Sequence, residues 1–204
     1  MRQNTIWDNE YSRLEWRKET RTLPSRVLAG KKVLELGVGN GKTLISIMRQ
    51  HPKEVHAIDF SEKAIEICRD KFHLDDIKFL KADVLNLPFE DNSFDAVVCY
   101  YVLNNLNENE RRLAVSEIHR VLKDDGLVLF EDFSVGDFRF KKGSNTIADN
   151  TIMKVNGISC HFFTDKEVKE LFSDFSKVKL EVRETKPLRG KDYTRKLINA
   201  VVRK

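Results

Sequence analysis

Three glycines at every second position, Gly37, Gly39 and Gly41, closely follow an acidic residue, Glu35. The apolar run around this acid predicts a strand, and residues 43–49 have helical character. Without side chains, glycines let the backbone turn tightly and let a ligand approach the free N–H groups at the start of a helix. The pattern therefore predicts a loop that holds a small cofactor.

Two well-known glycine loops do not match these residues. A P-loop requires a glycine five residues before the Gly41-Lys42-Thr43 triplet, and that position holds Leu36. The dinucleotide fingerprint G-x-G-x-x-G requires its third glycine one residue later than Gly41. The remaining pattern is E/D-x-G-x-G-x-G, which the chain matches at residues 35–41.

A second acid, Asp59, ends another short apolar run, 18 residues beyond Gly41. A carboxylate at this position can accept hydrogen bonds from ribose hydroxyls, and Phe60 could pack on one face of an adenine ring. The competing interpretation makes Asp59 a helix N-cap, a role that Ser61 suits better. We therefore expect Asp59 and Phe60 to contact a cofactor that contains a nucleoside.

The segments that would position these residues alternate between two kinds. Short runs, mostly apolar or β-branched, predict strands at residues 32–37, 54–59, 77–81, 94–100 and 126–132. Between them, helical patterns cover residues 41–50, 61–72 and 108–122. This alternation predicts parallel β-α units in a doubly wound sheet, with the run at 94–100, apolar on both faces, at its centre.

The C-terminal part breaks the alternation. Thr164 predicts a helix N-cap, with Glu167 at the capping-box position. Two strand-like runs follow, 176–184 and 195–203, and the proline and glycine between them predict a turn and an antiparallel pair. The residues thus predict a parallel sheet finished by an antiparallel hairpin.

Together these segments resemble the class I S-adenosylmethionine-dependent methyltransferases of type 11, over about residues 30–132. The glycine loop resembles motif I of that family, and further matches follow in order at Asp59, 79–89, 91–98 and 124–129. One departure is Asp124-Asp125, where the family usually has proline and glycine before the retained Gly126. The resemblance implies an α/β, Rossmann-like, seven-stranded, mostly parallel sheet with a C-terminal antiparallel hairpin and helices on both faces.

The resemblance also implies a cofactor, S-adenosyl-L-methionine, with S-adenosyl-L-homocysteine as product. Asp83 would accept from the adenine amine and Val84 would donate through its backbone, while Glu35 would lie near the methionine amino group or orient the loop. In related enzymes an N-terminal helix covers the cofactor, and here Tyr11 could approach the donor's carboxylate; a helix that simply caps the core is the equal alternative. The expected cofactor-binding residues are Glu35, Gly37, Gly39, Asn40, Gly41, Asp59, Phe60, Asp83, Val84, Tyr100 and Tyr11.

The acceptor should bind beyond the C-terminal ends of the fourth and fifth strands. The expected catalytic residues there are Tyr100, Asn104 and Asp132, although packing is an equal explanation for the tyrosine. Transfer from a sulfonium mainly requires an oriented acceptor, because the donor is already activated. An asparagine is a poor base, so the sequence favours an acceptor that is already nucleophilic, such as a thiol, an amine or a ring nitrogen.

The sequence leaves three functions open. Chain size and the near-neutral charge of the body favour a small-molecule acceptor. The alternative, a base of tRNA or another RNA, rests partly on residues 183–204, which carry +6 in a chain of net charge +4; a basic terminus can meet phosphates, although a solvated edge hairpin is the preferred interpretation. It rests also on a weaker resemblance to the 3-methylcytidine tRNA methyltransferases, at 7–11, 139–143, 161–165 and 183–185. A non-catalytic, cofactor-binding regulator is the third possibility.

Composition narrows the protein class. With 41% hydrophobic and 33% charged residues, no apolar leader and no membrane-length apolar run, a cytoplasmic protein without a membrane partner is expected. Cys68, Cys99 and Cys160 are far apart, which argues against a disulfide framework or a zinc site, and no metal is expected. The length of 204 residues predicts one domain. Its expected parts are an N-terminal lid helix (1–25), a cofactor-binding core (30–135), an acceptor-side insert (136–163) and a C-terminal helix and hairpin (164–204).

Overall fold

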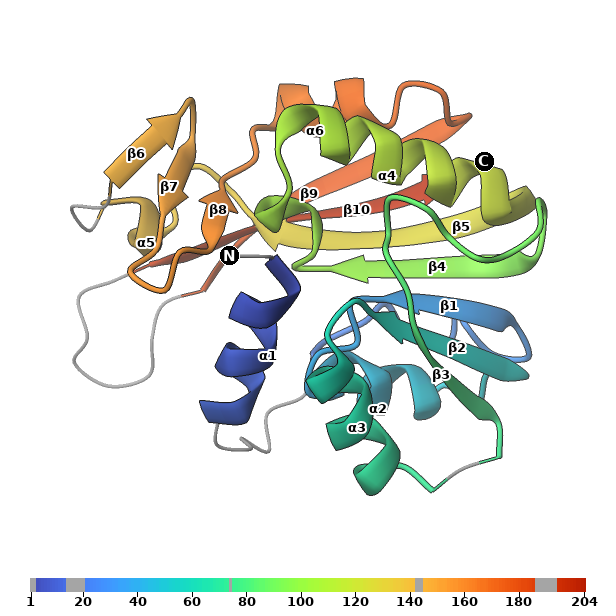
Figure 1. The fold of residues 1–204 in the computed structure, drawn as a ribbon. Helices are drawn as coiled ribbons and strands as arrows, with labels where there is room; N and C mark the ends of the chain where they lie inside the picture. Colours follow the sequence, from blue (N-terminus) through green and yellow to red (C-terminus); the bar gives the residue numbers. More distant parts are fainter. Residues whose placement is uncertain (1–2, 14–20, 74, 142–144, 186–193) are drawn as a thin grey trace.

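A seven-stranded sheet forms the centre of the molecule in the computed structural model, which describes residues 3–13, 21–73, 75–141, 145–185 and 194–204 (Figure 1). The strand order is β3-β2-β1-β4-β5-β10-β9. Strand β10 runs antiparallel to both of its neighbours, and the other pairs are parallel. The strands are β1 (Lys32–Leu36), β2 (Glu54–Asp59), β3 (Ile77–Lys81), β4 (Phe94–Tyr100), β5 (Leu122–Phe133), β9 (Lys177–Thr185) and β10 (Arg195–Arg203). The expected Rossmann-like sheet with its antiparallel hairpin is confirmed.

Helices cover both faces of this sheet, as expected (Figure 1). On one face, α2 (Lys42–Met48) and α3 (Glu62–Lys71) contribute residues such as Ile47 and Ile65 to a buried hydrophobic cluster. On the other face, α4 (Glu108–Val121) and α6 (Asp165–Leu171) contribute residues such as Ile118 and Val168 to a second cluster. Each helix buries an apolar stripe against the sheet, and this burial provides most of the favourable free energy of folding.

The central strand β4 shows why the sheet is two-sided. Val97 and Cys99 belong to the cluster on the α4 side, while Ala96 and Val98 belong to the cluster on the α2 side. Successive side chains of a strand point to opposite faces, so a strand covered on both sides must be apolar throughout. The two-sided apolar run seen in the sequence therefore marks the centre of the sheet.

Polar side chains fix the starts of three helices. Ser61 caps α3 by accepting from the Ala64 N–H, and Asn107 forms a full capping box with Glu110 at the start of α4. Thr164 caps α6 by accepting from the Glu167 N–H. The Glu167 side chain takes other partners, described below.

Strand β5 is longer than the sequence predicted. It begins at Leu122, directly after α4, and passes through Asp124 and Asp125, which precede the strand expected at 126–132. Asp125 has a left-handed φ of 60° there, and the pairing with β4 shifts between Phe94 and Ala96. The departure from the family pattern at Asp124-Asp125 therefore coincides with an irregularity within the strand.

Residues 136–163 contain structure that the sequence did not reveal. They form α5 (Phe138–Lys141) and a separate antiparallel sheet in the order β6-β7-β8, made of Asn145–Ala148, Thr151–Met153 and Ser159–His161. Ile152, Cys160 and Phe162 form its small core. Such short strands carry little periodic signal, because each has only one or two inward-facing residues.

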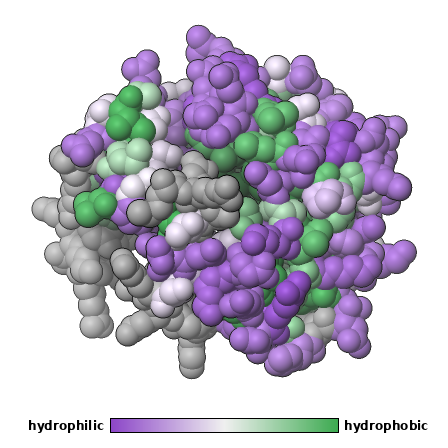
Figure 2. Space-filling model, in the orientation of Figure 1, coloured by the Kyte–Doolittle hydropathy of each residue, from purple (hydrophilic) through white to green (hydrophobic). Residues whose placement is uncertain are grey.

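The face shown in Figure 2 is largely hydrophilic, with hydrophobic residues in separate small patches. Exposed apolar side chains include Ile147 on β6 and Val155 in the turn between β7 and β8. Within the described ranges, no helix is both long and apolar enough to cross a membrane.

Candidate active site

The glycine turn after β1 has a conformation that suits glycine. Gly37, Gly39 and Gly41 have φ values of 66°, 53° and 77°, all left-handed. Space is also limiting, because a Cβ on Gly37 would lie 2.6 Å from Val102 Cγ2 and one on Gly41 would lie 2.5 Å from Phe72 Cε2. The glycine spacing in the sequence thus reflects both backbone conformation and close packing.

Asp59 at the end of β2 holds this turn in place. Its Oδ2 accepts from the Gly39 N–H and its Oδ1 from the Ser61 N–H, both at 2.9 Å. Burial raises the pKa of the carboxyl group to about 6, although both hydrogen bonds favour the ionised form. Each carboxylate oxygen can accept more than one hydrogen bond, so Asp59 keeps capacity for a ligand.

Glu35 is the least satisfied polar group of the site. Its side chain is buried, and neither carboxyl oxygen has a hydrogen-bond partner in the structure. Burial, and then the nearby Asp59, raise its pKa well above the usual range. A buried acid without a partner is costly, so this group fits a ligand that brings a donor or a positive charge.

Helix α1 (Gln3–Arg13) lies beside the turn, next to Gly39. Its Asp8 accepts from the Ser61 hydroxyl and, at 3.3 Å, from the Lys63 N–H at the start of α3. Its Tyr11 hydroxyl lies 3.0 Å from the Cβ position of Gly39. Helix α1 therefore lies beside the loop, and the segment expected to form a lid continues through residues 14–20, which lie outside the described ranges.

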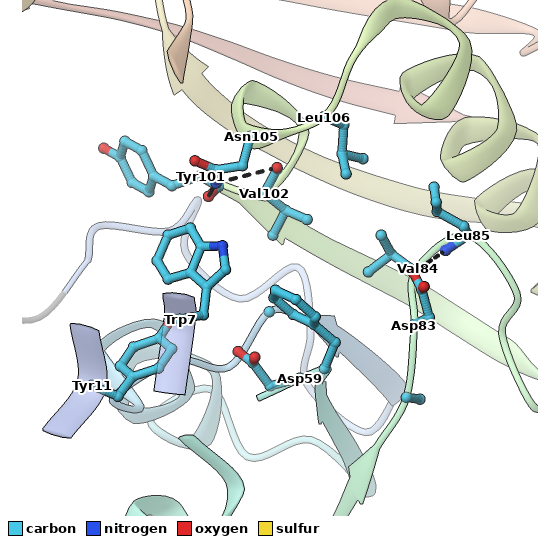
Figure 3. Close-up of a pocket in the computed structure, with 13 residues that line it drawn as sticks. Trp7, Tyr11, Asp59, Asp83, Val84, Leu85, Tyr101, Val102, Asn105 and Leu106 are labelled. Atoms are coloured by element: carbon cyan, nitrogen blue, oxygen red, sulfur yellow. Dashed lines mark hydrogen bonds between the residues drawn. The ribbon is translucent and has the colours of Figure 1, made fainter. Parts of the chain in front are cut away.

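A cavity of about 110 Å³ opens between α1, the ends of β1, β2 and β4, and the loop after β3. Trp7, Val84 and Val102 point into it from three sides (Figure 3). Its lining residues are Trp7, Tyr11, Gly37, Asp59, Phe60, Ala82, Asp83, Val84, Leu85, Tyr101, Val102, Asn105 and Leu106.

The lining indicates the charge of the ligand. Asp59 and Asp83 are acidic, and none of the described lining residues is lysine, arginine or histidine. A pyrophosphate would lack a cationic partner here, whereas a cation with hydroxyl and amino groups would meet carboxylates and the faces of aromatic rings. The donor set therefore fits a positively charged nucleoside.

Comparison with known proteins agrees with this chemistry. Residues 34–130 match the family described as methyltransferase domain. The chain carries a methyltransferase domain. The match covers the strands and turns that build the cavity floor, from β1 into β5.

Individual relatives extend the likeness beyond the methyltransferase domain. The tRNA N(3)-methylcytidine methyltransferase Mettl2 of Drosophila melanogaster is 29% identical over 73% of this chain and 49% of its own length. The demethylmenaquinone methyltransferase of Clavibacter sepedonicus is 38% identical over 58% of this chain and 47% of its own length. The chain thus spans about half the length of these relatives. A S-adenosylmethionine-dependent methyltransferase structure from Methanosarcina mazei has the same fold, with a TM-score of 0.70 and 21% identity over 86% of this chain and 94% of that one.

Ten of the eleven expected cofactor residues fall into two groups, and the eleventh, Tyr100, lies outside this cavity. Gly37, Asp59, Phe60, Asp83, Val84 and Tyr11 line the cavity of the methyltransferase domain. Glu35, Gly39, Asn40 and Gly41 lie in the strand and turn that shape its floor, without lining it. Asp83 is exposed and accepts from the Leu85 N–H at 2.9 Å, which folds the loop that carries Val84.

The three expected catalytic residues lie elsewhere. Tyr100 lines a different hollow on the sheet, with Leu129 and Asn199. Asn104 and Asp132 are buried together: the Asn104 N–H donates to Asp132 Oδ2 at 3.0 Å. Burial raises the pKa of Asp132 well above its usual range. The Asp132 carboxylate thus holds the backbone of the turn that carries Asn105.

Three lining residues, Trp7, Tyr101 and Asn105, were not among the expected catalytic or cofactor-binding residues, although the sequence placed Tyr101 and Asn105 near the acceptor. Tyr101 follows β4 with a left-handed φ of 60°, so the alternation of strand side chains ends one residue before it. The following 3-10 helix η1 (Leu103–Asn105) then directs Asn105, rather than Asn104, to the cavity. The sequence signal for Tyr101 and Asn105 was their place directly after the fourth strand, and for Trp7 it was the apolar face of the first segment.

The small sheet braces the far side of the cavity. Strand β8 packs on η1, where the Ser159 hydroxyl donates to the Asn105 carbonyl at 3.0 Å. None of the described residues of 136–163 lines the cavity itself. The acceptor-side insert therefore supports the turn that carries Asn105 and does not itself line the cavity with any described residue.

Proposed function

We propose that this chain binds S-adenosyl-L-methionine in the cavity and transfers its methyl group to a nucleobase nitrogen of RNA. The observation that carries the donor is the acidic, aromatic lining without a described cation, next to the unpartnered buried carboxyl of Glu35. S-adenosyl-L-homocysteine would be the second product.

Each part of the donor has a matching residue. Asp59 would accept from the ribose hydroxyls while it holds the glycine turn. Phe60 and Val84 would enclose the adenine, and Asp83 would accept from its amine. Glu35 would attract the methionine ammonium, and Tyr11 would close the carboxylate end from α1. When bound, the donor supplies a methyl group already activated on a sulfonium sulfur.

The chain's own part in transfer is orientation. Trp7, Tyr101 and Asn105 would hold the acceptor in line with the methyl group and exclude water. Burial raises the pKa of Tyr101, and its hydroxyl donates a hydrogen bond to Glu131. An acceptor that needs no strong base therefore fits best, and the lone pair of a ring nitrogen is of this kind.

The choice of RNA rests on relatives as much as on the site. The sequence favoured a small molecule, but Mettl2, whose name describes a tRNA methylcytidine enzyme, is similar to 73% of this chain. A small-molecule acceptor stays as the second candidate, because the demethylmenaquinone methyltransferase is 38% identical over a shorter stretch.

Labelled methyl transfer separates these candidates. The chain is incubated with methyl-labelled donor and either total RNA or the low-mass fraction of one extract, and the products are digested to nucleosides. Label in a modified nucleoside, lost in Asp59→Ala, supports the proposal. Label only in the low-mass fraction supports the small-molecule candidate, and tight donor binding without any transfer supports a regulator.

A further inference from the structure

Three arginines gather on the face of the sheet beside the cavity. Arg21, Arg183 and Arg195, the arginine cluster, all act electrostatically on the buried Glu131 of β5. None of them forms an ion pair with another described residue. The three guanidinium groups outnumber the two carboxylates on this face, Glu131 and Glu181, which leaves the region with excess positive charge.

Aromatic rings fix one edge of the cluster. The Arg21 guanidinium lies 4.3 Å from the centre of the Tyr101 ring, and Tyr101 donates to Glu131 Oε1 at 2.5 Å. The centre of the Phe133 ring lies 5.1 Å from the centre of the Tyr101 ring. The Arg139 guanidinium lies 4.7 Å from the centre of the Phe133 ring. Stacking on a ring orders a guanidinium while its N–H edges stay available, so less entropy is lost when an anion binds.

Strand β10 adds donors that lack acceptors. Asn199 stands opposite Glu131 on β5 and opposite Glu181 on β9, so all three share one face. Asn199 Nδ2 and Arg195 Nε are both buried without a hydrogen-bond partner. Unpaired donors beside unneutralised guanidinium groups fit a ligand rich in anionic oxygens.

The cluster also lies where a substrate strand would pass. Tyr101 belongs both to this surface and to the cavity lining, so the two sites share a wall. Resting on the RNA acceptor proposed above, we propose that Arg21, Arg183 and Arg195 bind backbone phosphates of a single-stranded RNA segment whose target base enters the cavity beside Tyr101. A single strand fits because a base must leave its stack to align with the methyl group.

Fluorescence anisotropy with a labelled 12-nucleotide single-stranded RNA tests this surface in the full chain. The triple variant Arg21→Gln, Arg183→Gln, Arg195→Gln should bind roughly tenfold or more weakly, and its salt dependence should fall by about 2 in log–log slope, at ~0.7 per lost phosphate contact. The matched control neutralises Arg112, Lys166 and Lys169, exposed cations on α4 and α6, and should change affinity less than twofold. Calorimetry with S-adenosyl-L-homocysteine should give the same affinity for all three proteins.

Specific results would overturn the inference. Unchanged RNA affinity in the triple variant, with cofactor binding intact, removes the arginine cluster from the RNA surface. Equal binding of linear polyphosphate and RNA by the wild type makes it a general anion surface. If the wild type binds cofactor but no RNA, the proposed acceptor fails together with this surface, while the donor site stands. If the triple variant loses cofactor binding, the single variant Arg183→Gln replaces it in the test. Its log–log slope of RNA affinity against salt should change by less than about 1.

Discussion

The carboxylate of Asp59 accepts a hydrogen bond from the backbone N–H of Gly39 at 2.9 Å, so the end of β2 holds the turn that follows β1. The same side chain accepts from the Ser61 N–H at the start of α3. Two motifs that are separate in the sequence therefore form one rigid floor. Changes at either residue should act first on cofactor affinity.

Gly39→Ala should weaken binding of S-adenosyl-L-homocysteine by roughly tenfold, measured by calorimetry. The residue has a left-handed φ of 53°, which costs other residues about 1 kcal/mol. Its new Cβ would also lie 3.0 Å from the Tyr11 hydroxyl and displace α1. Gly30→Ala is the control, because Gly30 has a similar φ of 67° with open space around it. It should lose stability without losing affinity.

A double variant sharpens the Gly39 test. Tyr11→Phe removes the hydroxyl that the new Cβ would meet, and the nearest ring carbon lies at an ordinary 3.5 Å. The double variant Gly39→Ala, Tyr11→Phe should therefore lose less binding free energy than the two single variants lose in total. Strict additivity would show that the two residues do not interact.

Cofactor binding should weaken as the pH falls from 7 to 5. Burial raises the pKa of Asp59 to about 6, so the carboxylate that would accept from ribose hydroxyls takes up a proton in this range. Affinity should fall by roughly tenfold by pH 5, following proton linkage. Asp59→Asn should bind weakly with no step near pH 6, whereas Glu35→Gln should keep the step. A step that persists in Asp59→Asn would contradict the assignment.

Ionisation of Asp59 should also affect stability, in the opposite direction: it favours cofactor binding but lowers the free energy of unfolding. An aspartate in the unfolded chain has a pKa near ~3.9, below the value of about 6 in the fold. The folded state therefore holds the proton more tightly, and the contribution of Asp59 to the free energy of unfolding decreases as the pH rises from about 4 to 6. Thermal unfolding of wild type and Asp59→Asn should diverge across that window.

The cofactor floor could be predicted because its signals are local. The spacing of Gly37, Gly39 and Gly41 fixes a turn, and acids such as Asp59 end strands whose carboxyl ends meet at one edge of a parallel sheet. The acceptor side depends on how the chain leaves β4. The left-handed conformation of Tyr101 changes which of the side chains after β4 point toward the cavity. This conformation is set by packing rather than by residue type.

Contacts between segments far apart in the chain also could not be predicted from the sequence. The Arg21 stack on Tyr101 and the approach of Tyr11 to Gly39 join segments far apart in the chain. Nothing in the periodicity of either segment specifies its partner. The arginine cluster likewise exists only in the fold, because it collects residues from β9, β10 and the N-terminal part. Arg189 and Lys191, also in the basic terminus, lie outside the described residues.

Asp8→Ala should loosen the lid. Asp8 joins α1 to the start of α3 through the Ser61 hydroxyl and the Lys63 N–H, and the helix N-terminus favours its negative charge. Without it, bound S-adenosyl-L-homocysteine should dissociate several-fold faster in stopped-flow measurements, while association changes less. Ser12→Ala is the control, because its hydroxyl bonds only within α1, to the Asp8 carbonyl. Equal dissociation rates in both variants would mean that α1 does not retain the cofactor.

Glu167→Gln should lower stability more than cofactor affinity. Burial alone would raise the pKa of Glu167, but His161 and Arg111 together lower it, so the carboxylate is ionised and paired. His161 Nε2 lies 2.8 Å from Glu167 Oε1, and Arg111, which also donates to the Leu106 carbonyl at 2.7 Å, lies 3.3 Å away. Removing the charge leaves the largely buried Arg111 without its acid, at a cost of about 2 kcal/mol for this partly exposed pair.

Glu170→Gln provides the matched comparison on the same helix. Glu170 pairs with Lys166 at 3.6 Å, and both side chains are mostly exposed, so its loss should cost at most ~0.5 kcal/mol. Thermal unfolding at pH 7 should therefore show a drop of several degrees for Glu167→Gln and almost none for Glu170→Gln. Because the lowered pKa stabilises the fold only while Glu167 is ionised, the gap between wild type and Glu167→Gln should shrink as the pH falls below about 4. A gap that is constant from pH 7 to pH 3 would show that the Glu167 charge does not hold β8 and α4 together.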